Sequence, residues 1–149
     1  MATLAQNKGI NTKYEILETY HAGILLQGHE VKSVRAHRAN LRGSFVKIID
    51  GEAFWVGGTI APYQAGNTPK DYRSDRRRKL LLKKQELSRF IGKSQEKGLT
   101  LIPLSLYTKA AWIKMEFAIA RGLKKHDKRE KLKEREFLRR KAKLEGRSM

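Results

Sequence analysis

The last 29 residues, Arg121 to Met149, constrain the fold most because they cannot supply a hydrophobic core. They hold 13 Lys or Arg residues against 5 Asp or Glu residues, a net charge of +8, and few large apolar residues. Such a segment buries too little apolar surface to offset the entropy it would lose on ordering. We therefore expect this basic segment to be disordered when free and to fold on a partner.

Positive charge is distributed unevenly along the rest of the chain. The 149 residues carry a formal net charge of +18, and Lys70 to Gly98 alone holds 11 basic and 4 acidic residues. Clustered positive charge is typical of proteins that bind polyanions. Nucleic acid, RNA above all, is favoured over an anionic membrane because the basic segments lack a wide aromatic-rich apolar face.

Three features that the sequence lacks limit the class of protein. The chain has no cysteine, which excludes disulfides, thiol catalysis and cysteine-ligated zinc. It has no apolar run near the roughly 18 residues that a membrane span needs. Its first residues, MATLAQNKGI, lack the apolar core of a signal peptide. These features predict a soluble, cytoplasmic protein that does not associate with membranes.

Alternating apolar and polar residues predict strands over much of the chain. The segment 13–27 alternates, with Glu18 as the exception on a face that carries Tyr14, Ile16, Tyr20, Ala22, Ile24 and Leu26. Residues 44–60 form a hairpin pattern around an Asp50-Gly51 turn. Two further strands are predicted at 100–107 and 112–120, where Ile113, Met115, Phe117 and Ile119 alternate with Trp112, Lys114, Glu116 and Ala118.

Helical spacing predicts two helices between these strands. One follows Gly28 and carries Val31, Val34, Arg38 and Leu41 on one face. The second carries Leu80, Leu87 and Ile91 and ends near Gly98, after a loop at 61–75.

About five mostly antiparallel strands hide their edges most economically in a barrel. We therefore expect a mainly β, OB-like antiparallel barrel with two or three flanking helices. The barrel would span 13–122, between an N-terminal arm at 1–12 and the basic tail at 123–149.

Two charged features of the barrel have competing interpretations. Glu30 opens the first helix, and a carboxylate favoured by the helix dipole is preferred to a semi-buried anchor beside the apolar stripe. The run from Arg76 to Lys79 is either a solvated charge run or a cluster whose mutual repulsion a counter-charged partner relieves. Leu81 lies off the apolar stripe, and beside these cations an exposed leucine can pack on an unstacked base.

No pattern predicts an enzyme, a metal site or a cofactor. His21, His29 and His37 recur every eight residues, which separates them by about 26 Å on a strand or about 80° around a helix. His126-Asp127 is a poor catalytic dyad because adjacent residues rarely face each other. Gly57-Gly58 lacks the Lys-Ser/Thr partner of a phosphate loop.

The tail alternates positive and negative residues at helical spacing. Lys131 follows Asp127 by four residues and Arg140 follows Glu136 by four, which supports a helix. A helix that is polar on nearly every side is seldom stable without a partner. Folding on binding is therefore favoured over a charged helix in solvent.

Taken together, the motifs resemble the SmpB family, the bacterial partner proteins of transfer-messenger RNA (tmRNA, also called SsrA RNA). The resemblance covers nearly everything from Asn7 to Phe137. The matching motifs, in order, are Asn7-Lys8, Gly28-His29-Glu30-Val31-Lys32-Ser33, Arg38-Ala39-Asn40, Asp50-Gly51-Glu52, Arg78-Lys79-Leu80-Leu81-Leu82, Gly98-Leu99-Thr100, Ala120-Arg121-Gly122, His126-Asp127-Lys128-Arg129 and Lys133-Glu134-Arg135-Glu136.

The resemblance implies an OB-like barrel and a function in trans-translation, the rescue of stalled ribosomes. Such a protein binds the tRNA-like domain of tmRNA and stands in for its missing anticodon arm. It delivers tmRNA, with elongation factor Tu on the charged RNA, to the ribosome. Its tail enters the small-subunit decoding centre and the empty mRNA channel, where it becomes helical. It acts as a monomer and without catalysis.

The resemblance and the charge run together predict the contact residues. The tmRNA-binding residues would be Asn7, Lys8, His21, Arg76, Arg77, Arg78, Lys79 and Leu81. The ribosome-binding residues of the tail would be His126, Asp127, Lys128, Arg129, Lys133, Glu134, Arg135 and Phe137.

Two of these positions depart from the family pattern. His21 stands where the family normally has Glu, so the contact would change from a hydrogen-bond acceptor to an imidazole that both donates and accepts. Phe137 stands where Trp is frequent, which keeps an aromatic ring but removes the indole donor.

Two other functions remain open at this point. A basic OB-like ribosomal or initiation-type protein would bind ribosomal RNA constitutively. An RNA-processing enzyme is a more distant alternative.

Overall fold

The structure, a computed structural model, describes residues 2–64, 66, 68–123 and 132–142. Its main sheet has seven antiparallel strands, and six of them form a closed ring because β9 pairs with both β2 and β8. The ring strands, in spatial order, are β8 (Leu99–Lys109), β4 (Phe45–Ile49), β5 (Glu52–Val56), β7 (Arg78–Leu81), β2 (Tyr14–Ile24) and β9 (Trp112–Gly122). The predicted mainly β, OB-like barrel is confirmed.

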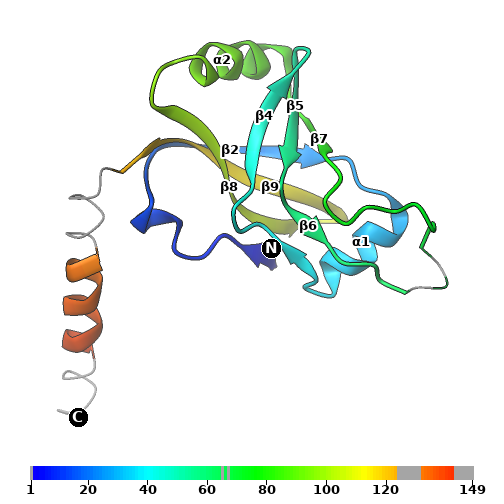
Figure 1. Ribbon diagram of the computed structural model, residues 1–149, viewed down its shortest axis with the longest axis horizontal. Coiled ribbons are helices and arrows are strands. Elements are labelled where there is room, and N and C mark those ends of the chain that lie inside the picture. The colour runs from blue at the N-terminus through cyan, green and yellow to red at the C-terminus, as the bar shows by residue number, and fades with distance from the viewer. Residues whose placement is uncertain (1, 65, 67, 124–131, 143–149) are drawn as a thin grey trace.

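Shorter elements surround the ring (Figure 1). They are β1 (Thr3–Gln6), which pairs with β8, the small sheet of β3 (Ala39–Asn40) and β6 (Thr59–Ile60), the 3-10 turn η1 (Ile10–Thr12), and the helices α1 (Gly28–Arg35) and α2 (Lys84–Ser94). The sequence pattern missed β1, because this short strand lies inside the segment predicted as an arm. Figure 1 shows α2 and α1 at opposite ends of the barrel.

A bulge in β2 changes which residues of the predicted strand face the core. Ile16 pairs with Ala120 and Glu18 pairs with Ile119, so Leu17 is an extra residue on β2. Directly paired residues share a face and the face alternates along β9. Ile16, opposite Ala120, therefore lies on the other face from Tyr20, which is opposite Phe117. The prediction that the whole strand keeps one apolar face is wrong at its first residues.

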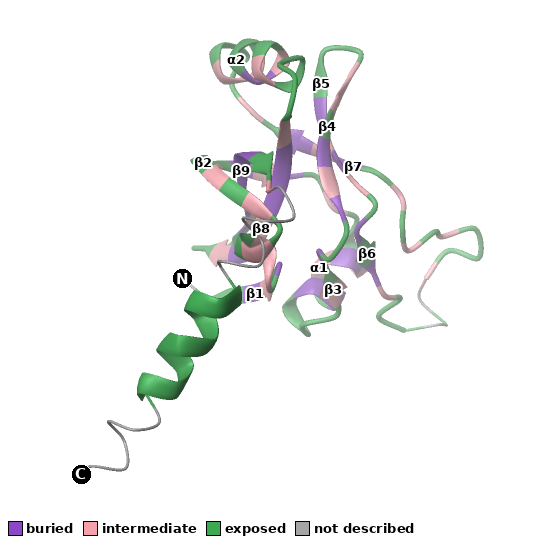
Figure 2. Ribbon diagram, turned by 60° about the vertical axis from the view of Figure 1, so that its left-hand side comes forward, coloured by how far each residue is buried: buried purple, intermediate pink, exposed green. Residues whose placement is uncertain are grey.

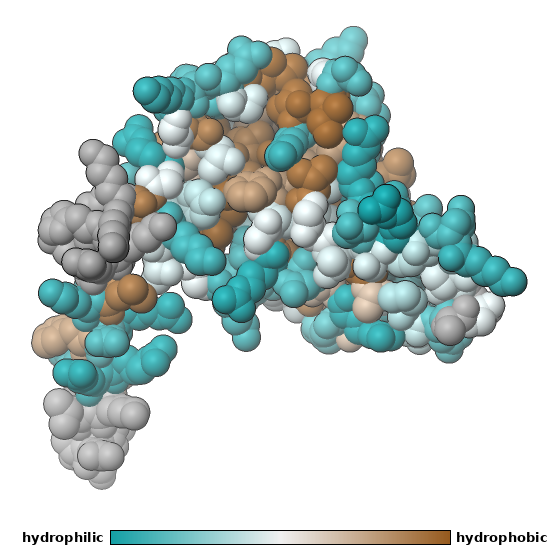
Figure 3. Space-filling model, in the orientation of Figure 1, coloured by the Kyte–Doolittle hydropathy of each residue, from teal (hydrophilic) through white to brown (hydrophobic). Residues whose placement is uncertain are grey.

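The barrel core comes from the alternating residues of the ring strands and from one face of α2. Met115 and Phe117 of β9 are fully buried, as the alternation predicted. Phe90 of α2 packs its ring edge-on against Tyr20 and Phe117, at centroid distances of 4.4 and 5.2 Å. Figure 3 shows apolar surface between α2 and the β4–β5 hairpin. Partly buried apolar residues, such as Ile48 of β4, pack against this core.

The segment around Leu80 forms a strand, where the sequence pattern predicted a helix. Leu80 lies in β7, which pairs with β5 on one side and β2 on the other, and α2 begins only at Lys84. The run from Leu80 to Leu82 is too short and too uniformly apolar for its period to separate a strand from a helix. Its tertiary pairing decides the outcome.

Helix α1 and the 44–60 hairpin agree with the sequence pattern. The hairpin turns at Asp50 and Gly51, whose φ angles of 50° and 78° fit the left-handed conformation that this pair favours. Arg38 and Leu41, predicted on the same helical face as Val34, lie beyond the end of α1. Within the described ranges, no helix is long and apolar enough to cross a membrane.

Candidate nucleic-acid interface

Strand β7 separates buried from exposed residues within the basic run. Along the strand, Arg78 and Leu80 are buried, Lys79 is half-buried and Leu81 is 52% exposed. Successive side chains of a strand point to opposite faces of the sheet, so Arg78 and Leu80 point inward and Leu81 points outward. The two faces of this one strand therefore serve different purposes.

The inward face meets a buried carboxylate from α1. Glu30 is fully buried and is the third residue of α1, so its side chain reaches back to accept a hydrogen bond from the Gln27 N–H at 2.9 Å. Its oxygens also accept hydrogen bonds from Tyr72 Oη at 3.0 Å, from Arg78 Nη2 at 2.7 Å and from Arg76. The favoured interpretation of Glu30 as only a helix-dipole residue is wrong, because this residue is a buried anchor.

Arg78 is the main partner of Glu30 and is itself fully buried. Its guanidinium also donates to the carbonyls of Gly58 and Ser74 and lies over the Trp55 ring, 5.3 Å from the centroid. A buried charge is tolerated only when it is paired and fully hydrogen-bonded. These hydrogen bonds connect α1, the loop before β7 and the turn after β5.

The environment of Glu30 keeps its carboxyl ionised. Burial by itself raises the pKa of Glu30, but hydrogen bonds from Arg76, the Gln27 N–H and Arg78 outweigh burial and lower the pKa from 4.5 to about 2. Burial and the neighbouring Glu30 carboxylate both raise the pKa of Tyr72. Tyr72 therefore stays protonated and acts as a donor to Glu30.

The four-residue basic run is consequently not one RNA-binding cluster. Arg78 is buried inside the fold and paired with Glu30, so its guanidinium is not exposed for the predicted tmRNA contact. Arg76 is half-buried against Glu30, and Lys79 Nζ lies 3.0 Å from the Glu52 carboxylate. Arg77 is exposed and lies over the Phe54 ring, 4.8 Å from its centroid. Of the run, Arg77 is the cation most available to a ligand.

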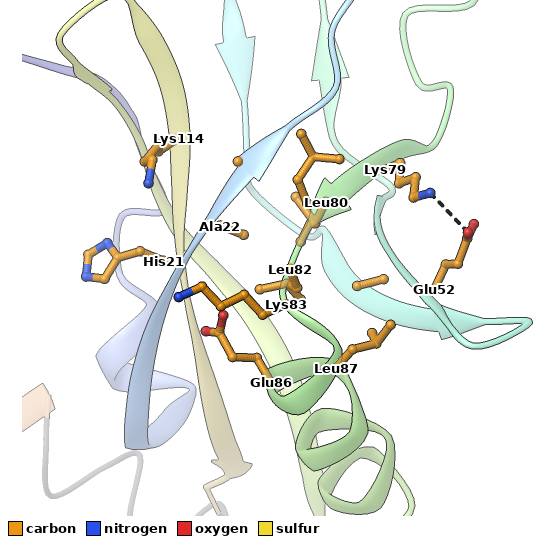
Figure 4. Close-up of a pocket in the computed structure, with 13 residues that line it drawn as sticks. His21, Ala22, Glu52, Lys79, Leu80, Leu82, Lys83, Glu86, Leu87 and Lys114 are labelled. Carbon is orange, nitrogen blue, oxygen red and sulfur yellow. Dashed lines mark hydrogen bonds and ion pairs between the residues drawn. The ribbon is translucent and has the colours of Figure 1, made fainter.

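The outward face of β7 borders a shallow hollow of about 490 Å³. Leu81 and His21 both line it, together with Lys79, Lys83 and Lys114 and with the acidic residues Glu52 and Glu86. Leu81 pairs with Gly23 of β2, which in turn pairs with Lys114 of β9. Figure 4 shows His21 and Lys114 on one side of β2, with Lys79 and Glu52 at the far side of the hollow. An exposed apolar side chain rimmed by lysines can hold an unstacked base and its phosphates.

His21 is held in place by a tyrosine. Its Nδ1 atom lies 2.7 Å from Tyr107 Oη, and the two rings meet edge to face at 5.6 Å. Burial, followed by the charge of Glu116, raises the pKa of Tyr107, so its hydroxyl keeps its proton. When that hydroxyl donates to Nδ1 of a neutral ring, Nε2 carries a proton and can donate to a ligand.

Asn7 and Lys8 do not line this hollow. Asn7 is only 7% exposed, and its Nδ2 atom donates to the Pro103 carbonyl at 2.8 Å. Lys8, the next residue, is exposed. Asn7 lines a second hollow with residues 9–12, and Glu134, Arg135 and Leu138 of the tail also line it. The structure thus divides the predicted tmRNA contacts between two places.

The described part of the tail is a helix at 132–142 in which every residue is exposed (Figure 2). Lys133, Glu134, Arg135 and Phe137 lie on it, and Phe137 is 66% exposed. The helix agrees with the sign alternation of the sequence. The other predicted tail contacts, His126, Asp127, Lys128 and Arg129, lie outside the described residues.

The three evenly spaced histidines have separate partners. His21 bonds Tyr107, His29 bonds Gln27, and His37 Nδ1 lies 3.1 Å from the Leu4 carbonyl. The described residues contain no group of three or more His, Asp or Glu side chains that could hold a metal ion.

Sequence reasoning missed two features of this surface. Tyr72 supports Glu30 from the loop predicted at 61–75, where no periodic pattern marks it. Trp112, at the start of β9, is 74% exposed. Its outward orientation follows from the alternation of β9, and that alternation was the available signal.

The barrel, its basic outer face and its helical basic tail define a class of protein, a small OB-like barrel built to meet a polyanion. Comparison with known proteins identifies the family. A family model described as "SmpB protein" matches residues 4–146. The chain therefore belongs to the SmpB protein family.

Relatives and a solved structure agree with this assignment. The SsrA-binding protein of Thermosynechococcus vestitus is 47% identical over 133 residues, covering 89% of this chain and 88% of the relative. That of Persephonella marina is 48% identical over 136 residues, covering 91% and 89%. A solved chain described as "tmRNA-SmpB: a journey to the center of the bacterial ribosome" is 44% identical with a TM-score of 0.63, covering 80% of this chain and 87% of that one.

Proposed function

We propose that this protein binds tmRNA and acts in trans-translation, the rescue of stalled ribosomes. The hollow on the outer face carries the proposal, because it combines an exposed Leu81, a held His21 and a lysine rim. Relatives named for SsrA binding, and a solved SmpB chain from a study of tmRNA and the ribosome, support the identity of the RNA. The protein is an RNA adaptor and performs no catalysis.

The barrel, residues 13–122, holds the tRNA-like domain of tmRNA and stands in for its missing anticodon arm. Leu81 packs against an unstacked base, and the Nε2 proton of His21 donates to an acceptor on a base or the backbone. Lys79, Lys83 and Arg77 neutralise phosphates around these contacts. Asn7 supports this surface indirectly by fixing the N-terminal segment, residues 1–12, to β8.

The tail, residues 123–149, acts on the ribosome. Its exposed helix presents cations for ribosomal RNA and the Phe137 ring for stacking. It occupies the decoding centre and the empty mRNA channel, so it detects that no message is present. The protein works in the cytoplasm as a monomer, and elongation factor Tu accompanies the charged tmRNA.

The test is a binding titration of the full chain with tmRNA for Leu81→Ala and for a matched control, Leu17→Ala. Leu17 is also exposed on the barrel surface, at 40%, but does not line the hollow. Removing an apolar contact with a base weakens binding by about 1–3 kcal/mol, so we expect about a tenfold loss for Leu81→Ala alone.

Equal affinities for the two variants would contradict the role of the hollow. Identifying the RNA that copurifies with the protein tests the remaining alternative. Recovery in equal amounts with small ribosomal subunits, without tmRNA, would instead indicate a constitutive ribosomal-RNA-binding protein.

A further inference from the structure

The tip of the β8–β9 hairpin carries the most exposed large apolar side chain among the described residues. Trp112 is 74% exposed, whereas Trp55, the other tryptophan, is buried and donates its Nε1–H to Ser44 Oγ at 2.9 Å. Trp112 opens β9 and pairs across the hairpin with Lys109. A large aromatic ring left this exposed frequently marks a binding site, because its burial would otherwise stabilise the fold.

The hairpin tip is held by the neighbouring helix. Arg35, the last residue of α1, donates from Nη2 to the Ala111 carbonyl at 3.1 Å. Figure 1 shows the β8–β9 turn beside α1. A tip that is already fixed loses little conformational entropy when it binds a ligand. The same contact places a guanidinium one residue from the Trp112 backbone.

The surroundings of Trp112 are cationic. Residues 105–115 contain Lys109 and Lys114 and no acidic residue. Helix α1 adds Lys32 and Arg35, and its one acid, Glu30, is buried and paired with arginines. The nearest acid along β9 is Glu116, two residues beyond Lys114. A flat apolar ring among cations complements an unpaired nucleobase with its phosphates better than it complements an apolar protein surface.

Trp112 lies on the same outer face as the hollow described above. Trp112 and Lys114 are two residues apart on β9, and Lys114 is joined through Gly23 to Leu81 by direct pairing. Two inter-strand spacings across the sheet and two residues along β9 give a Cα–Cα distance of roughly 12 Å between Trp112 and Leu81. A few nucleotides can span this distance. Trp112 and the residue that leads into the tail, Gly122, stand at opposite ends of β9, about 33 Å apart.

We propose that Trp112 is a stacking platform for an unpaired base of the same tmRNA that occupies the hollow. Lys109, Lys114 and Arg35 contact the phosphates beside that base. This inference rests on the proposed function, and it adds a second base-binding position to the outer face. The platform and the tail bind different RNA segments, because Trp112 and Gly122 stand at opposite ends of β9.

The experiment uses the full chain and the intrinsic fluorescence of its two tryptophans. The spectrum of the native protein minus that of Trp112→Phe isolates Trp112, because Trp55 contributes equally to both. On titration with tmRNA we expect the Trp112 emission to be quenched by about half or more and shielded from acrylamide. Trp112→Leu should bind about tenfold more weakly, whereas Trp112→Phe, which keeps a ring, should bind within about threefold of the native protein.

The outcomes separate this inference from the function beneath it. If tmRNA binds Trp112→Leu normally and leaves the Trp112 emission of the native protein unchanged, the platform is absent and the proposed function stands. If tmRNA fails to bind even the native protein, the proposed function itself fails. Quenching by small-subunit ribosomal RNA but not by tmRNA would overturn the assignment of this base to tmRNA. Because Trp112 is exposed, thermal melting should be unchanged in both variants, which keeps the comparison valid.

Discussion

The basic run at the start of β7 and the basic helix of the tail look alike in sequence and differ in structure. In the run, Arg76 and Arg78 bond Glu30, and Lys79 bonds Glu52. In the helix at 132–142, every residue is exposed. Dense positive charge therefore marks two different uses in this chain. In the barrel most of it serves the fold, and in the tail it is available to a partner.

The difference follows from where each segment lies. Strand β7 is hydrogen-bonded on both sides within a closed ring, so its inward positions are buried whatever residue they carry. An arginine at such a position requires a carboxylate, and α1 supplies it through Glu30. Every residue of the tail helix at 132–142 is exposed, so its cations remain in solvent.

Matched substitutions should separate the two uses most clearly. Arg78→Met leaves the buried Glu30 carboxylate without its main partner and should lower the free energy of unfolding by about 3–5 kcal/mol. Arg139→Met, in the exposed tail helix, should change it by less than about 0.5 kcal/mol. Urea denaturation followed by circular dichroism measures both. The double variant Glu30→Leu/Arg78→Met removes both charges and should be more stable than Arg78→Met alone. Equal stabilities for the two single variants would contradict the buried pairing.

Acid should weaken the barrel through the same carboxylate. The folded pKa of Glu30 is about 2, below its ordinary value of 4.5, so its contribution is complete above pH 4.5 and is lost as pH falls toward 2. The contribution at neutral pH is about 3 kcal/mol, and most of its loss falls between about pH 4.5 and pH 2. Urea denaturation across this range should show the loss in the native protein and its absence in Glu30→Leu/Arg78→Met. Parallel pH profiles would show that Glu30 is not the responsible group.

A smaller effect should distinguish the exposed from the paired cations of the run. Arg77→Ala should reduce the slope of log affinity for tmRNA against log salt concentration by about 0.7–0.9, the value for one phosphate contact. Lys79→Ala should reduce it less, because Glu52 already neutralises part of that charge. Filter binding at several salt concentrations gives both slopes. An unchanged slope for Arg77→Ala would mean that the whole run serves the fold.

The sequence predicts elements whose residues repeat locally. Helix α1, the hairpin around Asp50 and Gly51, and the alternation of β9 from Ile113 to Ile119 are all confirmed. Errors arise where distant pairing overrides the local pattern. Leu80 joins a strand because β5 and β2 flank it, and the bulge at Leu17 moves Ile16 to the other face.

The candidate site was predictable only in part. The exposure of Leu81 and its place near cations follow from the motif, and His21 is found through the family resemblance. The Glu30 cluster could not be predicted, because Arg76 and Arg78 stand 46 and 48 residues from Glu30 in sequence. Only the tertiary fold brings these charges together, so the basic run alone gave no sign that Arg78 is buried.

The division of labour between barrel and tail is tested most directly by the tmRNA affinity of a chain that ends at Leu123. This end point keeps the hydrogen bond from the Leu123 N–H to the Lys13 carbonyl, at 3.0 Å, and so preserves β9. We expect this shortened chain to bind tmRNA within about threefold of the full chain at moderate salt, where the long-range charge of the tail is screened. Loss of tmRNA binding on removal of the tail would contradict the proposal that the barrel alone selects this RNA.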